Sequence, residues 1–269
     1  MDPIRAHEGW FVSHLFYRIN RTVWESLDPA QQARQRDTFQ RLANDFQRAE
    51  HCQIHCYSIW GLKADLGMIL ISPELHSLND LEFDISTALS PGVLEPVDSF
   101  ISLTETSEYM SQTQDYDRTL REKDGLTPDS AKYQEKMEAF RQRMQVYTDE
   151  RLYPSIPEHE IVCFYPMNKQ RGDKDNWYLL DFETRKKYMA GHAITGRKFQ
   201  GHVRQLVTGS IGLENWEWGV TLFASDPYYF KKLLYEMRYD EASARFAEFG
   251  DFYVGIRLEP EELFKRLRL

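Results

Sequence analysis

The sequence repeats one local pattern, and the two copies lie about 152 residues apart. In each copy an acidic residue, a bulky apolar residue and a glycine lead into an apolar run, which is followed by a helix-capping residue and proline. The copies run from Asp65 to Pro73 and from Glu217 to Pro227. A repeat of this kind indicates two equivalent halves, and this restricts the fold more than any other feature.

The predicted elements have the same order in both halves: strand, helix, strand, strand, helix, strand. In the first half the strands fall at residues 10–19, 52–60, 66–71 and 97–103, and helices begin at Asp28-Pro29 and Ser72-Pro73. In the second half the strands fall at residues 160–166, 201–208, 217–224 and 251–258, with helices at 181–189 and from Asp226-Pro227. Chance similarity would leave this shared order unexplained. We therefore expect an α+β fold of two ferredoxin-like βαββαβ domains, of the dimeric α+β barrel type, produced by internal duplication.

The polar stretch between the halves sets the expected domain organisation. Acidic, basic and amide side chains crowd residues 112–124, and helix-forming residues predominate from 130 to 145. We interpret residues 110–150 as a solvated helical connector rather than as a third domain or a docking surface. The N-terminal ferredoxin-like domain would then comprise residues 1–109, and the C-terminal domain residues 151–269.

The charge balance excludes some classes of function. With 42 acidic against 33 basic residues, the formal net charge is −9, which disfavours non-specific binding of nucleic acid or of an anionic membrane. The three cysteines are too few for a disulfide scaffold or a four-cysteine metal site. The first residues lack the apolar stretch of a signal peptide, and the longest aliphatic run is residues 68–71. We therefore expect a soluble, cytoplasmic protein.

The segment His51-Cys52-Gln53-Ile54-His55-Cys56 contains four side chains that can bind metal. On a β-strand the two histidines point to one side, while the two cysteines point to the other. The four groups therefore cannot converge on one ion, and we predict an alternation of core and surface rather than a metal site. Motifs for phosphate cradling, dinucleotide binding, a hydrolase serine and a zinc protease are absent from the sequence.

A second group of reactive side chains lies in the second half. Tyr165, Met167 and Lys169 alternate along the end of a predicted strand, so a phenol, a thioether and an ammonium share one face. His192 stands among small residues near a helix end, and Gln205 lies on the next predicted strand. Singly, Tyr165 has an ordinary explanation as a core tyrosine, and His192 as a histidine at a helix C-terminus. Their occurrence together favours a functional site.

The motifs of the second half are similar to those of the chlorite dismutase-like family, and within it to the coproheme decarboxylases of the terminal haem pathway. They are Arg151-Leu152-Tyr153-Pro154, Cys163 to Lys169, Asp175-Asn176-Trp177-Tyr178, His192 to Lys198, Glu217 to Phe223 and Tyr235 to Arg245. Each motif alone is weak, whereas together they are specific. The resemblance covers both halves, and it implies a haem site in the C-terminal domain and a homopentameric ring.

The resemblance also implies roles for individual residues. His192 would be the proximal ligand of the iron, and Tyr165 the redox-active tyrosine next to the reactive propionate. Lys169 and Met167 would line a neighbouring propionate, with Lys169 handling a proton in the second round of reaction. The remaining contacts would come from Arg151, Ser243 and Arg197, which anchor carboxylates, and from Gln205 at the distal position.

The implied reaction is the hydrogen-peroxide-dependent decarboxylation of Fe-coproporphyrin III (coproheme), both substrate and cofactor, to haem b. A radical on Tyr165 would take a hydrogen atom from a propionate, carbon dioxide would leave, and a vinyl group would form, twice in succession. A small basic set inside an acidic protein suits a substrate with four carboxylates. Chlorite-decomposing relatives carry a distal arginine, and a neutral Gln205 cannot supply that charge.

Two alternatives stay open at this point: a chlorite dismutase or general haem peroxidase, and a non-catalytic haem carrier or sensor. The first would release oxygen from chlorite, and the second would bind haem b without converting coproheme. The expected partners are coproheme, hydrogen peroxide, further copies of the chain and, transiently, coproporphyrin ferrochelatase. The sequence departs from the family pattern at Ala193, where relatives often have glycine, and in the length of the connector.

Overall fold

The eight strands that the repeat predicts are present in the computed structural model, which describes residues 2–269 except the side chains of residues 260 and 261. The strands of the first half are β1 (Phe11–Ile19), β2 (Gln53–Trp60), β3 (Leu66–Ser72) and β4 (Leu94–Thr104). Those of the second half are β5 (Ile161–Lys169), β6 (Arg204–Gly209), β7 (Trp218–Ala224) and β9 (Tyr253–Leu258). A short strand, β8 (Ala247–Phe249), is an addition that the repeat does not predict.

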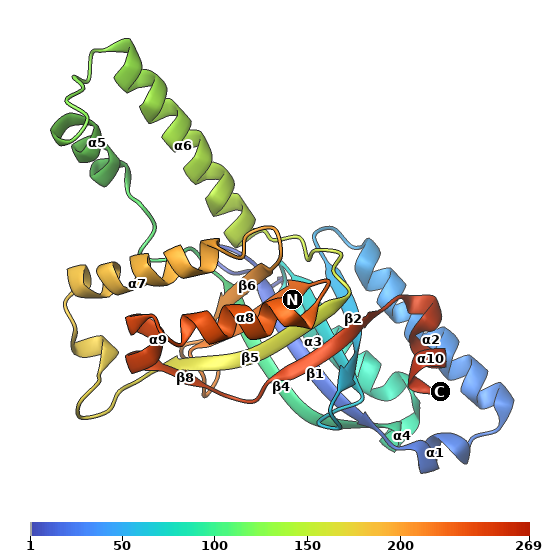
Figure 1. Cartoon of the computed structure of the whole chain (residues 1–269). Helices are drawn as coiled ribbons and strands as arrows, with labels where there is room; N and C mark the ends of the chain where they lie inside the picture. The colour runs from blue at the N-terminus through green and yellow to red at the C-terminus, as the bar shows by residue number, and fades with distance from the viewer. Residues whose placement is uncertain (1) are drawn as a thin grey trace.

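The strands close into a barrel (Figure 1). Each half has the ferredoxin-like order, β4-β1-β3-β2 in the first and β6-β7-β5-β9 in the second, and all these pairs are antiparallel. The halves join at both edges, where β2 pairs with β9 and β4 pairs with β6. Closure leaves none of these eight strands with an unpaired edge. The predicted fold class is therefore confirmed.

Helices cover the outer faces of the barrel. In the first half they are α1 (Arg21–Glu25), α2 (Pro29–Arg48), α3 (Leu75–Ala88) and α4 (Ser90–Val93). The second half has the short 3₁₀ helix η1 (Trp177–Leu179), α7 (Phe182–Arg197), α8 (Pro227–Met237), α9 (Glu241–Phe246) and α10 (Pro260–Leu267). The sequence patterns did not reveal α9 and α10. Helix α10 packs back on the first half, where its Leu263 and Phe264 join the same core as Phe39.

Side-chain caps set two of the predicted helix starts, at Asp28 and Asp226. Asp28 accepts a hydrogen bond from the backbone N–H of Gln31, whose side chain in turn accepts one from the backbone of Asp28. The start predicted at Ser72-Pro73 is wrong, because Ser72 ends β3 and α3 begins at Leu75 without a side-chain cap. The helix predicted at residues 181–189 is wrong in its end, because α7 continues to Arg197. Isolated glycines such as Gly191 cost a helix only about 1 kcal/mol each, so they did not stop it.

The barrel interior and the two outer faces form separate apolar cores, as strand alternation requires. The interior core contains side chains from both halves, among them Phe16, Tyr57, Phe164 and Phe223. His14 is buried inside the barrel, with its Nε2 2.8 Å from Thr221 Oγ1. Burial lowers the pKa of His14 to about 3, so it stays neutral at physiological pH.

Helices α5 (Thr113–Glu122) and α6 (Ala131–Leu152) form a hairpin that projects from the barrel (Figure 1). The hairpin has its own small core of Leu120, Tyr133, Met137 and Phe140, so it is more than a solvated connector. Helix α6 is also longer than predicted and runs through the proposed boundary at residue 150. None of the helices in residues 2–269 is long and apolar enough to cross a membrane.

The repeated glycine of each half allows a neighbouring side chain to fill the barrel. A Cβ added at Gly67 would lie 2.6 Å from Cδ1 of Ile59, and one added at Gly219 would lie 2.6 Å from Cε1 of Phe100. Both distances are far below van der Waals contact. The glycine of the repeated pattern is therefore required by packing in both halves.

We predict that Gly219→Ala lowers the free energy of unfolding by about 1–3 kcal/mol, because the added methyl group overpacks the interior against Phe100. Urea denaturation of the apoprotein measures the change. Gly191→Ala is the matched control, since an added Cβ there meets nothing within 4 Å and improves helix propensity. Equal stability of the two variants would contradict this account of the repeat.

Candidate active site

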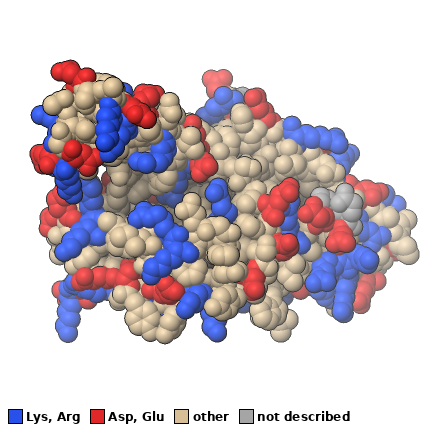
Figure 2. Space-filling model, turned by 45° about the horizontal axis from the view of Figure 1, so that its top comes forward, with Lys and Arg blue, Asp and Glu red and all other residues tan. Residues whose placement is uncertain are grey.

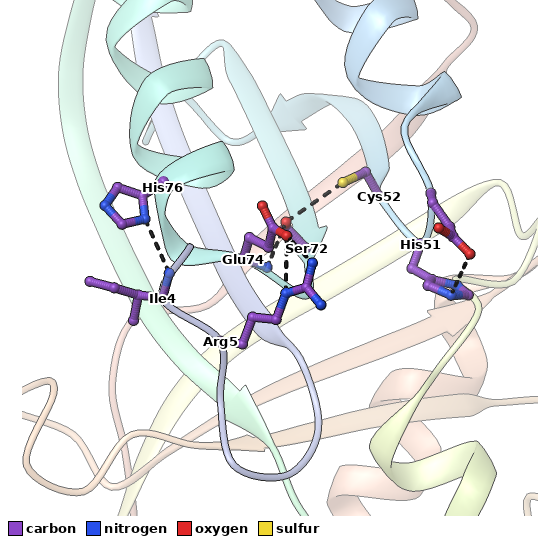
Figure 3. Close-up of polar contacts among 8 residues, drawn as sticks. Ile4, Arg5, His51, Cys52, Ser72, Glu74 and His76 are labelled. Atoms are coloured by element: carbon purple, nitrogen blue, oxygen red, sulfur yellow. Dashed lines mark hydrogen bonds and ion pairs between the residues drawn. The ribbon is translucent and has the colours of Figure 1, made fainter. Parts of the chain in front are cut away.

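The histidines and cysteines of residues 51–56 do not form a site. Figure 3 shows Cys52 directed at Ser72, with Sγ 3.6 Å from Oγ, while His51 Nε2 lies 3.4 Å from the carboxylate of Glu50. Cys52 and Cys56 are buried in the core of the first half. The predicted strand alternation applies only from Gln53, where β2 begins; it is wrong for His51 and Cys52, which precede the strand, with His51 at a φ of 62°.

Strand β5 carries different side chains on its two faces. Phe164 lies in the barrel interior, whereas Tyr165 and Met167 belong to the core on the outer face. The Tyr165 ring is 4 % exposed and stacks on Phe252, with the ring centroids 4.5 Å apart. Burial raises the pKa of Tyr165, so its phenol keeps its proton at neutral pH. The outer face of β5 thus presents a neutral, protonated phenol.

Lys169 ends β5 on the same face and is 8 % exposed. Its Nζ lies 4.4 Å from the centroid of the Trp177 ring and 3.5 Å from the carbonyl oxygen of Ala242. Burial lowers the pKa of Lys169 to about 8, although the negative charges of Asp240 and Glu217 act in the opposite direction. The ammonium can therefore give up a proton near neutral pH more readily than an exposed lysine can.

His192 is held by a carboxylate from another helix. Its Nδ1 lies 3.2 Å from Oδ2 of Asp240, and Ser243 Oγ lies 3.3 Å from Nδ1 while donating to Asp240. Asp240 is also the N-cap of α9, since its other oxygen accepts from the backbone N–H of Ser243. With Nδ1 engaged in this way, Nε2 is the nitrogen available to a metal.

The helix that carries His192 does not pack on the sheet. None of the 16 residues of α7 is buried. Its counterpart in the first half, α2, buries Phe39, Ala43 and Phe46. Helix α7 therefore presents His192 without contributing a fully buried side chain to the outer core of the second half.

Arg151 and Gln205 line one cavity of about 350 Å³ between the end of α6 and β6. Nε of Arg151 is buried and has no hydrogen-bond partner in residues 2–269. An anionic ligand group would accept the hydrogen bond that this Nε–H can donate. Figure 2 shows the surface hollowed beneath the projecting hairpin, with lysine and arginine side chains at its edge. These features suit a ligand with carboxylates.

The structure brings most of the predicted site residues into two groups, one around β5 and His192 and the other around Arg151 and Gln205. Lys169 contacts Ala242, which directly precedes Ser243, and so joins the β5 residues to the His192 group. Val220 of β7 pairs with Tyr165 of β5 on one side and with Val207 of β6 on the other. Gln205 lies two residues before Val207, so it is on the same face of the sheet as Tyr165. Their backbones are therefore about 12 Å apart across the same face. Arg197, exposed at the end of α7, has no hydrogen bond or ion pair to another predicted site residue in the described part of the chain.

Sequence reasoning missed Asp240 and the contact of Trp177 with Lys169. Both residues lie in motifs that the resemblance includes, Tyr235 to Arg245 and Asp175 to Tyr178. The signal for Asp240 was its position three residues before Ser243, a spacing typical of a helix N-cap. No local signal connects Asp240 with His192, because 48 residues separate them.

Comparison with known proteins identifies the family. A sequence profile of the family described as Chlorite dismutase matches residues 32–258. The chain belongs to the chlorite dismutase family. It is 37 % identical over 264 residues to a coproheme decarboxylase of Staphylococcus carnosus, covering 95 % of this chain and 94 % of that protein. It is also 37 % identical, over 97 % of its length, to a putative heme-binding protein of Natronomonas pharaonis, of which it spans only 41 %.

Two solved structures agree with the fold. A heme-binding protein from Thermus thermophilus superposes with a TM-score of 0.81 at 36 % identity, covering 99 % of both chains. A variant of the chlorite dismutase from Candidatus Nitrospira defluvii has a TM-score of 0.73 at 13 % identity, covering 98 % of this chain and 97 % of that one. The second likeness concerns the fold alone. The family match and the haem-related relatives confirm the prediction of a haem-related enzyme of this family, without specifying its reaction.

The observed groups fit an iron porphyrin. His192 with its carboxylate partner has the arrangement typical of a metal-binding histidine, and it would be the residue that holds the iron of such a group. The unpartnered Nε of Arg151 and the buried ammonium of Lys169 match the charge of peripheral carboxylates.

We predict that Lys169→Met raises the free energy of unfolding of the apoprotein at pH 7 by up to ~3 kcal/mol, since burial of the ammonium lowers the lysine pKa from 10.5 to about 8. Between pH 8 and 10.5 the unfolded chain holds a proton that the folded chain has lost, so the wild-type protein gains stability with rising pH and the advantage of the variant shrinks. Urea denaturation at a series of pH values measures the difference. The exposed Lys231→Met is the control, and a pH-independent difference for Lys169→Met would refute the assignment.

Proposed function

We propose that this protein decarboxylates coproheme to haem b with hydrogen peroxide as the oxidant. The observation that carries the proposal is the outer face of β5, where a buried, protonated tyrosine and a buried lysine with a lowered pKa lie four residues apart on one side of the strand. The similarity to the Staphylococcus carnosus coproheme decarboxylase over 94 % of that protein supports the same substrate. Coproheme then acts as both substrate and cofactor.

Binding of coproheme would use residues from four elements. His192 on α7 would bind the iron through Nε2, while Asp240 orients the ring. Arg151, in the last turn of α6, would bind a propionate with its free Nε. The exposed Arg197 would contact a propionate at the open edge, Met167 would pack beside Tyr165, and Ser243 would add a hydroxyl near the His192 group.

The reaction removes two electrons from each propionate. One propionate, one peroxide and one proton give a vinyl group, carbon dioxide and two waters, and the iron porphyrin supplies the oxidising equivalents when peroxide is present. Tyr165 would lose its phenolic hydrogen, and the radical would then take a hydrogen atom from the propionate, which removes the first electron. The carbon radical left behind would give the second electron to the remaining oxidising equivalent of the peroxide as carbon dioxide leaves. Lys169 would hold the departing carboxylate and exchange a proton with it in the second round. Two rounds, through a three-propionate intermediate, give haem b.

Gln205 favours this reaction over chlorite chemistry. It lies on β6 in the cavity that Arg151 lines, and its neutral amide cannot attract an anionic oxidant as an arginine does. Hydrogen peroxide is uncharged and needs no such group. A neutral distal side chain therefore suits peroxide, while the cations near the propionates select the substrate.

We also propose the biological setting that the family resemblance implies. The protein would act in the cytoplasm as a homopentamer and receive coproheme from coproporphyrin ferrochelatase in a transient contact. The acidic net charge of −9 supports a partner other than nucleic acid or an anionic membrane. Sedimentation analysis of the purified protein tests the ring size.

We predict that Tyr165→Phe slows both decarboxylations by about 100-fold or more, because the variant has no phenolic hydrogen to lose. Mass spectrometry of a mixture of protein, coproheme and peroxide measures the loss of two carbon dioxide molecules, and a spectral titration measures coproheme binding, which should change little. Tyr57→Phe is the matched control: Tyr57 is equally buried, but it lies inside the barrel and its hydroxyl has no hydrogen-bond partner in residues 2–269.

Normal decarboxylation by Tyr165→Phe would remove the tyrosine from the mechanism. The same incubation distinguishes the alternatives. Rapid oxygen release from chlorite would indicate a chlorite dismutase, and tight binding of haem b without conversion of coproheme would indicate a carrier or sensor. Either result with the wild-type protein would overturn the proposed function as a whole.

A further inference from the structure

The ammonium of Lys169 has an unusual set of neighbours for a buried charge. It is 8 % exposed, yet no ion pair within 4.0 Å involves it in residues 2–269. Within the described residues its one hydrogen bond, to the carbonyl of Ala242, is long at 3.5 Å. Beyond that carbonyl, the ammonium faces the Trp177 ring, whose centroid lies 4.4 Å from Nζ.

The carboxylates that face Lys169 are committed to other donors. Glu217 accepts a hydrogen bond of 2.8 Å from the backbone N–H of Lys169. Asp240 accepts from Ser243 and binds His192. Both carboxylates add favourable long-range charge, but neither contacts the ammonium. The ring, together with the Ala242 carbonyl, therefore fixes where Nζ lies.

The position of the Trp177 ring is itself fixed by the fold. The backbone N–H of Trp177 donates to the carbonyl of Gln170, the residue after Lys169, over 2.9 Å. Asn176 caps the short helix η1 that begins at Trp177. The ring is 3 % exposed and packs edge-on against Phe246, with the centroids 5.2 Å apart. Trp177 is thus held in place independently of Lys169.

We propose that Trp177 is a positioning residue for Lys169, holding its ammonium by a cation–π interaction that leaves N–H groups free for a substrate carboxylate. A carboxylate in the place of the ring would neutralise the charge and compete for the same N–H groups. An aromatic face attracts the cation but accepts no proton, so it keeps the ammonium both charged and available. The use of the ammonium rests on the proposed function, whereas the cation–π contact does not.

The contact is tested in the apoprotein by NMR of lysine labelled with ¹³C at Cε, with the Lys169 signal assigned from its loss in Lys169→Met. The ring current of Trp177 should move the Lys169 signal upfield. Trp177→Leu should abolish this displacement and lower the Lys169 pKa by about one unit, because the cation loses its partner. Trp24→Leu, which removes a buried tryptophan from the core of the first half, should leave both values in place.

Fluorinated tryptophan separates the electrostatic contact from packing. Fluorine withdraws charge from the ring face with almost no change of shape, so mono- and difluorotryptophan should lower the Lys169 pKa stepwise, and the same labels in a Trp177→Phe background should not. A Lys169 pKa that is the same in all of these proteins would overturn the proposal. With coproheme, Trp177→Leu should slow the second decarboxylation more than the first. If turnover changes while the Lys169 chemical shift and pKa do not, the cation–π contact is refuted and the proposed function still stands.

Discussion

The pairing of β5 is the constraint on which the site depends. β5 pairs with β7 along one edge and with β9 and β8 along the other, so its register cannot slip without breaking both edges. A shift of one residue would exchange Phe164 and Tyr165 between the barrel interior and the outer face. Closure of the barrel therefore determines that a phenol, a thioether and an ammonium share one side. The chemistry is arranged by backbone hydrogen bonds before any ligand is bound.

The environment of each group on that side sets its charge state. Burial keeps the phenol of Tyr165 protonated, and the same burial brings the pKa of Lys169 down to about 8. Asp240 is negative and lies close to both His192 and Lys169, but its hydrogen bonds go to His192 and Ser243. Because the nearby carboxylates are bound elsewhere, the cations stay available to an incoming anion. A protein with a net charge of −9 can thereby hold a locally basic site.

The sequence predicted the fold and the strand face well, and it failed where distant segments meet. Strand alternation was enough to place Tyr165, Met167 and Lys169 together, because it is a local property with a period of two. The contact between His192 and Asp240 joins residues 48 positions apart, and no periodicity encodes such a contact. The extent of α7 was underestimated because its glycines resemble helix stop signals. The length of α6 was underestimated too, so the prediction did not show that the last turn of the connector helix carries Arg151.

The duplication also explains why only one half carries the proposed site. Phe16 pairs with Gly67 on β3, and Pro166 pairs with Gly219 on β7, so the repeated glycines set the correspondence between β1 and β5. The residues of β1 that match Tyr165, Met167 and Lys169 are Leu15, Tyr17 and Ile19. In the first half these three belong to a closed apolar core with residues of α2, α3 and α10. In the second half the matching helix, α7, buries no residue, and an ammonium replaces the isoleucine. In the first copy the helix after the first strand closes the core, whereas in the second copy the matching helix buries no residue and carries His192 of the proposed site.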